Sequence, residues 1–292
     1  MRRAEHSSGF EPPPHATSDR PGAWPRLRGP VLRWLRLNGF VALIYLLAAV
    51  AWQAATRGFH IPSFLLPSPA AIIERASHVP AQLLRHSLIT LAEVLEGFLL
   101  GAVVSIPLGI LVVYSHLLER VIYPFLVAFQ AIPKVALAPI LVVWFGFGPS
   151  SKVMLAFVTA MFPIIVNTVI GMKQTPVELV YLMRSLRASE AQIFLKIRLY
   201  TAAPYIFAGF KIGITLAMVG AIVGEFIASN GGLGYLLLAA NNNIDTPLLF
   251  AVVAVLSALS IALYYAVEAV ESLVLPRPLR SGSVRLEQRI RP

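Results

Sequence analysis

Cysteine is absent from this chain of 292 residues, and charged side chains make up only 13% of it. Without cysteine the fold has neither disulfides nor thiolate metal ligands, although this absence does not identify a compartment. No phosphate-binding Gly-x4-Gly-Lys-Ser/Thr loop is present, so the chain lacks that device for hydrolysing ATP. The six histidines show no spacing typical of a metal site, and no enzyme motif stands out. We therefore expect no catalytic residue, cofactor or metal.

Apolar sequence dominates instead, since 57% of the residues are hydrophobic. Charge-free runs of about 18 residues or more are long enough to cross a bilayer core of about 30 Å. They predict an all-α polytopic membrane protein, and glycines such as Gly101 and Gly213 are expected to let its helices pack closely. Six membrane-spanning helices are expected, at residues 38–56, 87–115, 120–145, 153–172, 204–227 and 247–267.

The segments outside these spans differ in composition. Proline, arginine and few apolar residues in 1–36 predict a disordered basic tail, and no cleavable signal peptide is expected. A Gly- and Asn-rich loop is predicted between the last two spans, from Ser229 to Asn243. The expected organisation is a tail at 1–36, the first span with an extracytoplasmic connection at 37–84, a five-span core at 85–275, and a second basic tail at 276–292.

Lysine and arginine are unevenly distributed between the two sides of the membrane. With six spans and a cytoplasmic N-terminus, 18 of the 24 Lys and Arg residues lie inside and only four lie outside. This positive-inside bias predicts that both termini, and the segment between the fourth and fifth spans, face the cytoplasm. The net charge of +10 is therefore mainly a topology signal, and nucleic acid is not an expected partner.

The segment between the fourth and fifth spans has helix signals of its own. Thr175-Pro176-Val177-Glu178 and Ser189-Glu190-Ala191-Gln192 each have the pattern of a capping box. Apolar residues at helical spacing follow each box, which predicts two short amphipathic helices. Such a pair is either a lever that a soluble partner grips or two interfacial helices that pack against the protein's own base.

Ionisable residues inside spans are costly, so they are candidates for function. Lys134 follows Pro133, where we expect a bent backbone. Its amine faces a cavity or a second subunit, or it is a structural lysine paired with a glutamate or with carbonyl groups. Glu225 lies near the outer end of the fifth span, where it borders a translocation path or marks the membrane boundary. Lys211 is close enough to the cytoplasmic end to snorkel. Glu93 and Glu96 are one turn apart near the outer face, where a solvated helix start is expected in preference to a proton relay.

Several motifs in combination resemble one family of transporters. The chain is similar to the membrane-spanning permease subunit of ATP-binding-cassette (ABC) importers, in the nitrate/sulfonate/taurine branch, which also includes permeases for pyrimidine thiamine precursors, riboflavin and aromatic acids. The resemblance covers roughly residues 60–275, and the matching segments are Gln130–Pro139, Trp144–Gly148, Phe162–Thr168, Gly224–Phe226 and Gly231–Tyr235.

This resemblance implies the six-helix, MetI-like fold of type I importers, with a cytoplasmic coupling loop at about 174–203. The family pattern there is Glu-Ala-Ala, then Gly, then Leu-Pro. Tyr181-Leu182-Met183 replace Glu-Ala-Ala, Arg187 replaces the Gly, and Tyr200 replaces the Pro after Leu199, whereas Pro204 and Gly209 match. The residues expected to contact the ATPase are Tyr181, Leu182, Met183, Arg184, Leu186, Arg187, Ala188 and Ser189.

The resemblance further implies the partners and the location. They are a cytoplasmic ABC ATPase dimer, an extracytoplasmic solute-binding protein, a second permease copy and the lipid bilayer of a bacterial inner membrane. The expected function is ATP-driven import of a small solute, with Lys134 and Glu225 as candidates for the path. A self-sufficient ion-coupled secondary transporter stays open as the alternative, although that class has repeated halves with broken helices, and no matching second half is visible.

Overall fold

The computed structural model describes residues 28–275, and every regular element in that part of the chain is a helix. Two units are described separately, with the boundary after Ala51, so the first contributes only the beginning of α1. The elements are α1 (Arg28–Gly58), α2 (Pro69–His78), α3 (Pro80–Tyr114), α4 (His116–Ala131), η1 (Lys134–Leu137), α5 (Ala138–Phe145), α6 (Pro149–Lys173), α7 (Val177–Ser185), α8 (Glu190–Ile193), η2 (Phe194–Arg198), α9 (Leu199–Ala228), α10 (Leu233–Asn242) and α11 (Thr246–Val274).

Four helical stretches of the described chain are long and apolar enough to cross a membrane, namely Pro80–Tyr114, Pro149–Lys173, Glu190–Ile227 and Thr246–Val274. They confirm the second, fourth, fifth and sixth predicted spans. The first predicted span lies within α1, which begins at Arg28 and so includes residues expected in the disordered tail. Residues 1–27 and the predicted tail at 276–292 lie outside the described residues.

Over the third predicted span, 120–145, the chain forms three consecutive helical elements, and none of them alone belongs to the four long apolar stretches. α4 ends at Ala131, η1 is a single 3-10 turn, and α5 follows at once. The bend expected at Pro133 is confirmed, because this residue has a ψ of 108° and cannot continue a helix. The break places Lys134 at the first position of η1.

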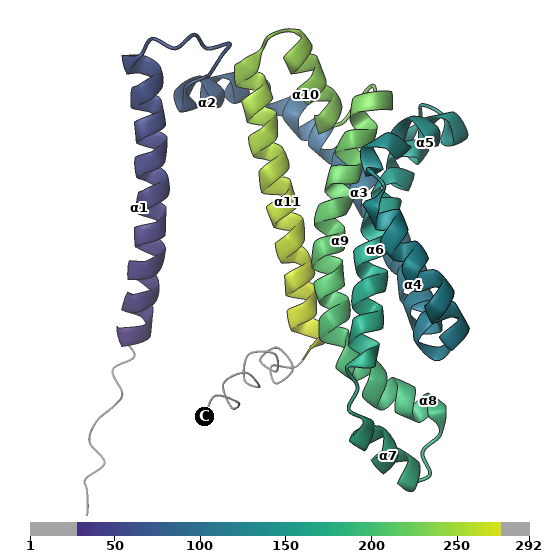
Figure 1. Cartoon of the computed structure of the whole chain (residues 1–292). Coiled ribbons are helices and arrows are strands. Elements are labelled where there is room, and N and C mark those ends of the chain that lie inside the picture. Colours follow the sequence, from purple (N-terminus) through teal and green to yellow (C-terminus); the bar gives the residue numbers. More distant parts are fainter. Residues whose placement is uncertain (1–27, 276–292) are drawn as a thin grey trace, which may run out of the picture. The chain divides into compact units, whose positions relative to one another are not determined.

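Close helix packing holds the centre of the second unit together. α6 packs along α3 and along α9, and α11 packs against α9 (Figure 1). A Cβ atom on Gly97 would lie 2.5 Å from the Cβ of Ala156 on α6, and one on Gly209 would lie 2.9 Å from the Cβ of Asn167. In a membrane such contacts supply much of the attraction between helices, because lipid is as apolar as the side chains.

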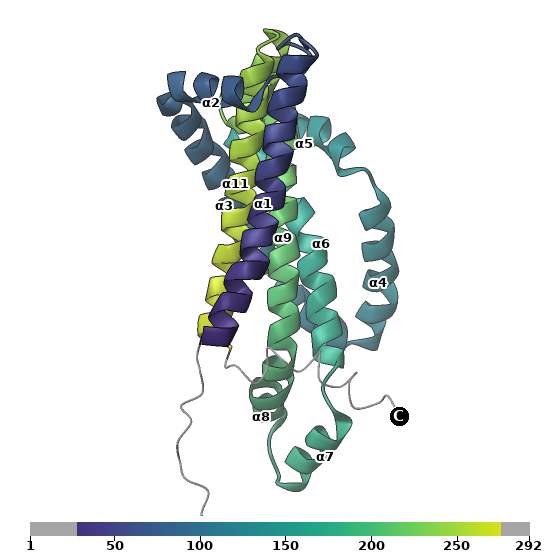
Figure 2. The same cartoon turned by 90° about the vertical axis from the view of Figure 1, so that its left-hand side faces the viewer.

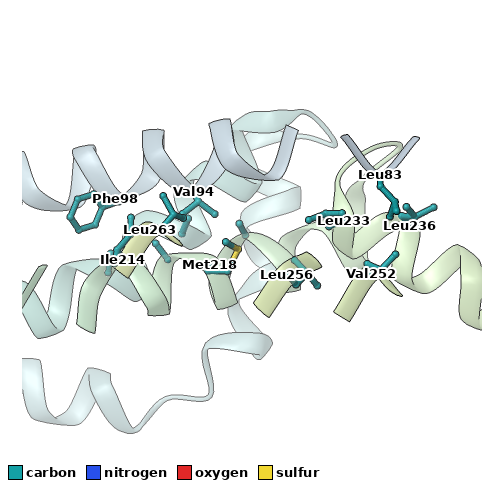
Figure 3. Packing of buried hydrophobic residues seen from close by; sticks show 14 of the residues in the cluster. Leu83, Val94, Phe98, Ile214, Met218, Leu233, Leu236, Val252, Leu256 and Leu263 are labelled. Carbon is teal, nitrogen blue, oxygen red and sulfur yellow. The ribbon is translucent and has the colours of Figure 1, made fainter. Parts of the chain in front are cut away.

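The largest apolar cluster joins α3, α6, α9, α10 and α11 (Figure 3). Met218 and Leu256 lie in it beside Leu233 and Leu236 of α10. The prediction of an irregular loop from Ser229 to Asn243 is therefore wrong over most of its length. Burial of the apolar face of α10 explains the difference, because the Gly and Asn residues at its two ends hide a short helix in the sequence.

Candidate functional site

Residues 174–203, which we call the coupling segment, extend beyond one end of the bundle (Figure 2), whereas α10 lies at the other end (Figure 1). Its first helix, α7, begins at Val177 with Pro176 at the cap position and no side-chain cap. The capping box predicted at Thr175 is therefore wrong. The Thr175 hydroxyl instead donates to the Met172 carbonyl at 3.0 Å and closes the end of α6. The Thr175 hydroxyl thus caps the C-terminus of α6 and not the N-terminus of α7.

The second capping box is confirmed. The backbone N–H of Gln192 donates to the Ser189 hydroxyl at 3.3 Å, and the Ser189 N–H donates to the Gln192 side chain at 2.9 Å. However, α8 is not a separate short helix as predicted. It passes through the π turn η2 directly into α9, so that Pro204 lies inside a helix and does not begin one. Ile193 is completely buried and fixes this continuous helix to the bundle.

The turn between α7 and α8 is a Schellman motif with Arg187 in the left-handed region, at φ 55°. The N–H of Ala188 donates to Met183 O at 3.0 Å, and the N–H of Arg187 donates to Arg184 O at 2.9 Å. Glycine is the usual residue at this position because it has no Cβ to clash with the backbone. The family pattern has Gly there, so the substitution of Gly by Arg187 leaves the turn geometry intact at an energetic cost.

Replacing Arg187 by glycine is expected to stabilise the chain by about 0.5–1 kcal/mol, because the left-handed conformation costs a side-chain residue about 1–2 kcal/mol and glycine loses part of that gain as entropy. Amide hydrogen exchange at Arg187 and Ala188 measures the effect. Ser185→Gly, inside α7, serves as the control and should destabilise by about 0.5 kcal/mol. If Arg187→Gly and Ser185→Gly change stability in the same direction and by the same amount, Arg187 is not in a strained left-handed conformation.

Most of the predicted ATPase-contact residues form one exposed surface. Tyr181, Leu182 and Leu186 are 65%, 55% and 69% exposed, which is unusual for large apolar side chains outside the membrane. Arg184 pairs with Glu190 at 2.9 Å across the turn, and this exposed pair adds little stability. Arg187 and Ser189 are also exposed, whereas Met183 and Ala188 are half-buried. An apolar surface with a basic rim suits a protein partner.

Lys134 lines a cavity of about 210 Å³ between η1, α6 and α9. A smaller cavity of about 50 Å³ shares Lys134, Thr159 and Leu216 with it. The Asn167 amide is held by the Pro163 carbonyl at 2.8 Å. The larger cavity therefore has a cation and an amide in an otherwise mostly apolar wall, and its lining is Lys134, Thr159, Phe162, Pro163, Val166, Asn167, Ile212 and Leu216.

Glu225 does not line either cavity and lies in the interior of the chain, where it is only 1% exposed. It accepts a hydrogen bond from the Thr90 hydroxyl at 2.6 Å and another from the backbone N–H of Gly234. The Leu233 N–H donates to Thr90 at 2.8 Å. A carboxylate at the N-terminus of a helix is favourable, so Glu225 and Thr90 together anchor α10. A Cβ atom on Gly232 would clash with Glu225 at 2.0 Å.

Two further charged residues of this region were not recognised as candidates from the sequence. Lys152 and Glu93 are both buried, and they form an ion pair of 2.8 Å between α6 and α3. The expectation that Glu93 belongs to a solvated helix start is wrong, although Glu96 is exposed. The available signal was the spacing of His86, Thr90 and Glu93, which places three polar residues on one face of α3.

Lys211 also differs from expectation. It pairs with Glu271 of α11 at 2.7 Å and lies over the Tyr264 ring at 5.7 Å. It therefore connects α9 to α11 and does not simply snorkel to the interface. The partner lies 60 positions further along the chain, so helical periodicity alone cannot indicate it.

The sequence matches, over residues 98–278, the model of a protein family described as "Binding-protein-dependent transport system inner membrane component". Two similar proteins are permeases by name. The formylaminopyrimidine transport permease protein ThiX of Halalkalibacterium halodurans is 37% identical over 80% of this chain and 94% of its own length. The riboflavin transport system permease protein RibX of Chloroflexus aurantiacus is 37% identical over 83% of this chain and 90% of its own length.

The fold is similar to that of a solved transporter subunit. A chain of the MetNI methionine ABC transporter, in an inward-facing conformation, superposes with a TM-score of 0.60 and is 20% identical. The superposition covers 67% of this chain and 97% of that chain. At this identity the likeness concerns the fold alone, and it confirms the expected MetI-like arrangement of the core.

Proposed function

We propose a working mechanism from the premise that this chain belongs to the binding-protein-dependent transport system inner membrane components and is the permease subunit of an ABC importer. Such a subunit is not an enzyme, and ATP hydrolysis belongs to a partner. Membership of this family decides against the self-sufficient secondary transporter. The ThiX and RibX similarities agree with the branch that the sequence motifs indicate.

The coupling segment is the proposed contact with the ATPase. The observation that carries this assignment is the exposed apolar surface of α7, formed by Tyr181, Leu182 and Leu186 at the end of the bundle opposite to α10. Ile193 anchors the other side of the segment in the protein interior, so a force on α7 and α8 reaches α9 directly. ATP binding closes the ATPase dimer and moves this segment, and hydrolysis resets it.

Six spans with both termini in the cytoplasm are the proposed topology, which the positive-inside bias supports. In this arrangement α4, η1 and α5 together make the third crossing, as a broken helix. A broken span is tolerated in a membrane where its free backbone groups lie against protein or a water-filled cavity. Two copies of the chain then enclose one pore, and exposed apolar residues of α4, such as Val121 and Phe125, face lipid or the second copy.

The translocation path is proposed to pass the Lys134 cavity. Lys134 lines both cavities at the break in the third span, and charged residues at membrane depth are rarely retained without a function. Glu225, the second candidate, is directed into the protomer, where it holds α10. We therefore assign the path role to Lys134 and an anchoring role to Glu225.

Lys134→Met is expected to reduce the rate of solute import by about tenfold, which is about 1.4 kcal/mol of activation free energy, because the apolar cavity then lacks a cation that stabilises a polar solute. Lys134→Arg, which keeps the charge, should retain most of the transport. The measurement is uptake and phosphate release in the same proteoliposomes. If the methionine and arginine variants transport equally well, the cationic role is excluded.

The solute is proposed to be small and organic, of the class that the names of ThiX and RibX describe, such as pyrimidine derivatives or flavins. Sulfonates, taurine and nitrate are the other substrates of the branch. In importers that depend on a binding protein, selection of the solute is expected mainly in that partner. The ligand of the binding protein is therefore the solute to use in the uptake assay.

The test of the proposed function is reconstitution with the cognate ATPase and binding protein. Proteoliposomes that contain all three, with ion gradients removed by ionophores, should accumulate the ligand of the binding protein only when Mg-ATP is present on the ATPase side. Uptake that follows an ion gradient without ATP would contradict the mechanism. Omitting the binding protein is the matched control, and it should abolish uptake.

A further inference from the structure

We propose that Tyr114 and Glu119 are positioning residues that transmit movement of the coupling segment to the Lys134 cavity. Both lie in the elbow between α3 and α4, which we define as residues 114–119. The inference rests on the proposed function, because it assumes that the ATPase moves the coupling segment. It adds a route from that segment to the pore.

The elbow contacts both ends of the coupling segment. Lys173, the last residue of α6 before the segment, forms an ion pair with Glu119. At the other end, the Arg198 guanidinium lies 5.1 Å from the centre of the Tyr114 ring. Phe194 packs edge-on against the same ring, with the ring centres 6.1 Å apart. The segment therefore cannot move at either end without acting on the elbow.

The Arg198 contact depends on the Tyr114 ring more than on hydrogen bonding. Among the residues that the structure describes, the buried Nε of Arg198 has no hydrogen-bond partner. An aromatic face attracts a cation that is partly removed from water. The π turn, Phe194–Arg198, carries both side chains that contact the ring. Such wide turns in helices are frequent at functional sites, because they change the direction of the side chains that follow.

The elbow also determines where α4 points. Within the described chain, α4 packs chiefly on α3, to which the elbow joins it. Leu117, Val121 and Phe125 on α4 are exposed, so packing within the protomer does little to restrain the rest of this helix. Sixteen helical residues extend about 24 Å, and this length leads from the elbow to Pro133 and Lys134. A small rotation at the elbow thus becomes a larger displacement at the cavity.

The absence of cysteine makes this route directly measurable. Val135→Cys introduces a unique thiol at an exposed position beside Lys134, and bimane attached to it reports its surroundings. The permease is assembled in nanodiscs with its cognate ATPase. Mg-ATP with vanadate, which traps a closed ATPase dimer, is the probe. In the parent protein we expect the bimane emission to shift when the probe is added.

Tyr114→Leu should reduce this shift by about fivefold or more, the size of a typical coupling between sites, while ATPase binding is retained. Tyr114→Phe keeps the ring and should keep the shift. Tyr200→Leu is the matched control, since Tyr200 is an exposed tyrosine on the first turn of α9. If Tyr114→Leu shifts the emission as the parent does, the proposal is overturned.

Charge reversal tests the second contact without removing an aromatic side chain. Glu119→Lys should diminish the shift, and the double variant Glu119→Lys with Lys173→Glu should restore it. If the double variant shows no larger emission shift than Glu119→Lys alone, the role of Glu119 is overturned. A parent complex that binds its ATPase but shows no shift contradicts the elbow route alone. A parent chain that does not bind the ATPase contradicts the proposed function itself.

Discussion

Leu186→Asp is expected to release the ATPase from the permease while the permease still inserts and folds in the membrane. Leu186 is the C-cap residue of α7 and is mostly exposed, so its loss removes few contacts within the chain. In the complex, however, a carboxylate would replace an apolar anchor. It would also lie at the helix C-terminus, where negative charge is unfavourable. Truncation of a central anchor costs about 2 kcal/mol or more, which is roughly a 30-fold loss of affinity.

Titration of the purified ATPase onto the permease in nanodiscs measures this loss. Val177→Asp is the matched control, because it places the same charge on the same helix outside the predicted contact set. At position 177 the carboxylate lies at the first residue of α7, where the helix dipole favours it. Equal affinity of the Leu186 variant and the parent would remove α7 from the ATPase interface.

Lys152→Met is expected to destabilise the permease by about 3–5 kcal/mol, because it leaves the Glu93 carboxylate buried without its cation. Glu225 lies near enough to Glu93 for the two carboxyl groups to interact, so the lysine compensates a site with two acids. Lys152 also donates to Ser229 at 2.9 Å, at the start of the turn before α10. Loss of the lysine should therefore loosen both the helix packing and this turn.

Removing both members of the pair should be far less damaging. In Lys152→Met with Glu93→Met no charge of the pair is left unpaired, and apolar replacements of a buried ion pair are often nearly neutral. Thermal unfolding in detergent compares the two variants. Lys173→Met is the control, because its partner Glu119 is partly exposed and such a pair contributes about 1 kcal/mol or less. A Lys152 variant as stable as the Lys173 variant would show that the buried pair is not structural.

The two ends of the bundle differ in the kind of surface they carry. At the coupling end, α7 keeps apolar side chains exposed, whereas Val180 and Ile193 of the same segment are buried. At the other end, Thr90 of α3 and Glu225 of α9 accept hydrogen bonds from the first N–H groups of α10. Exposed apolar surface favours a partner, whereas a buried hydrogen-bonded network favours a single arrangement.

The amino-acid sequence by itself determined the features that depend on neighbours along the chain. Apolar runs located four spans, Pro133 broke the third, and the Ser189 capping box formed as its spacing predicts. The motifs around Pro133 and Gly224–Tyr235 were sufficient to indicate the family. These signals are local, because a helix is built from hydrogen bonds between residues four positions apart.

Only the tertiary structure decided which distant groups meet. Glu225 and Thr90 are 135 positions apart, and Lys152 and Glu93 are 59 apart, so their contact exists only once α3, α6 and α9 have packed. The same is true of α10, which is helical because the bundle buries its apolar face, and of α8, which the burial of Ile193 joins to α9. Periodicity assigns a residue to a helix face, but the free energy of a buried charge depends on what the neighbouring helix places opposite it.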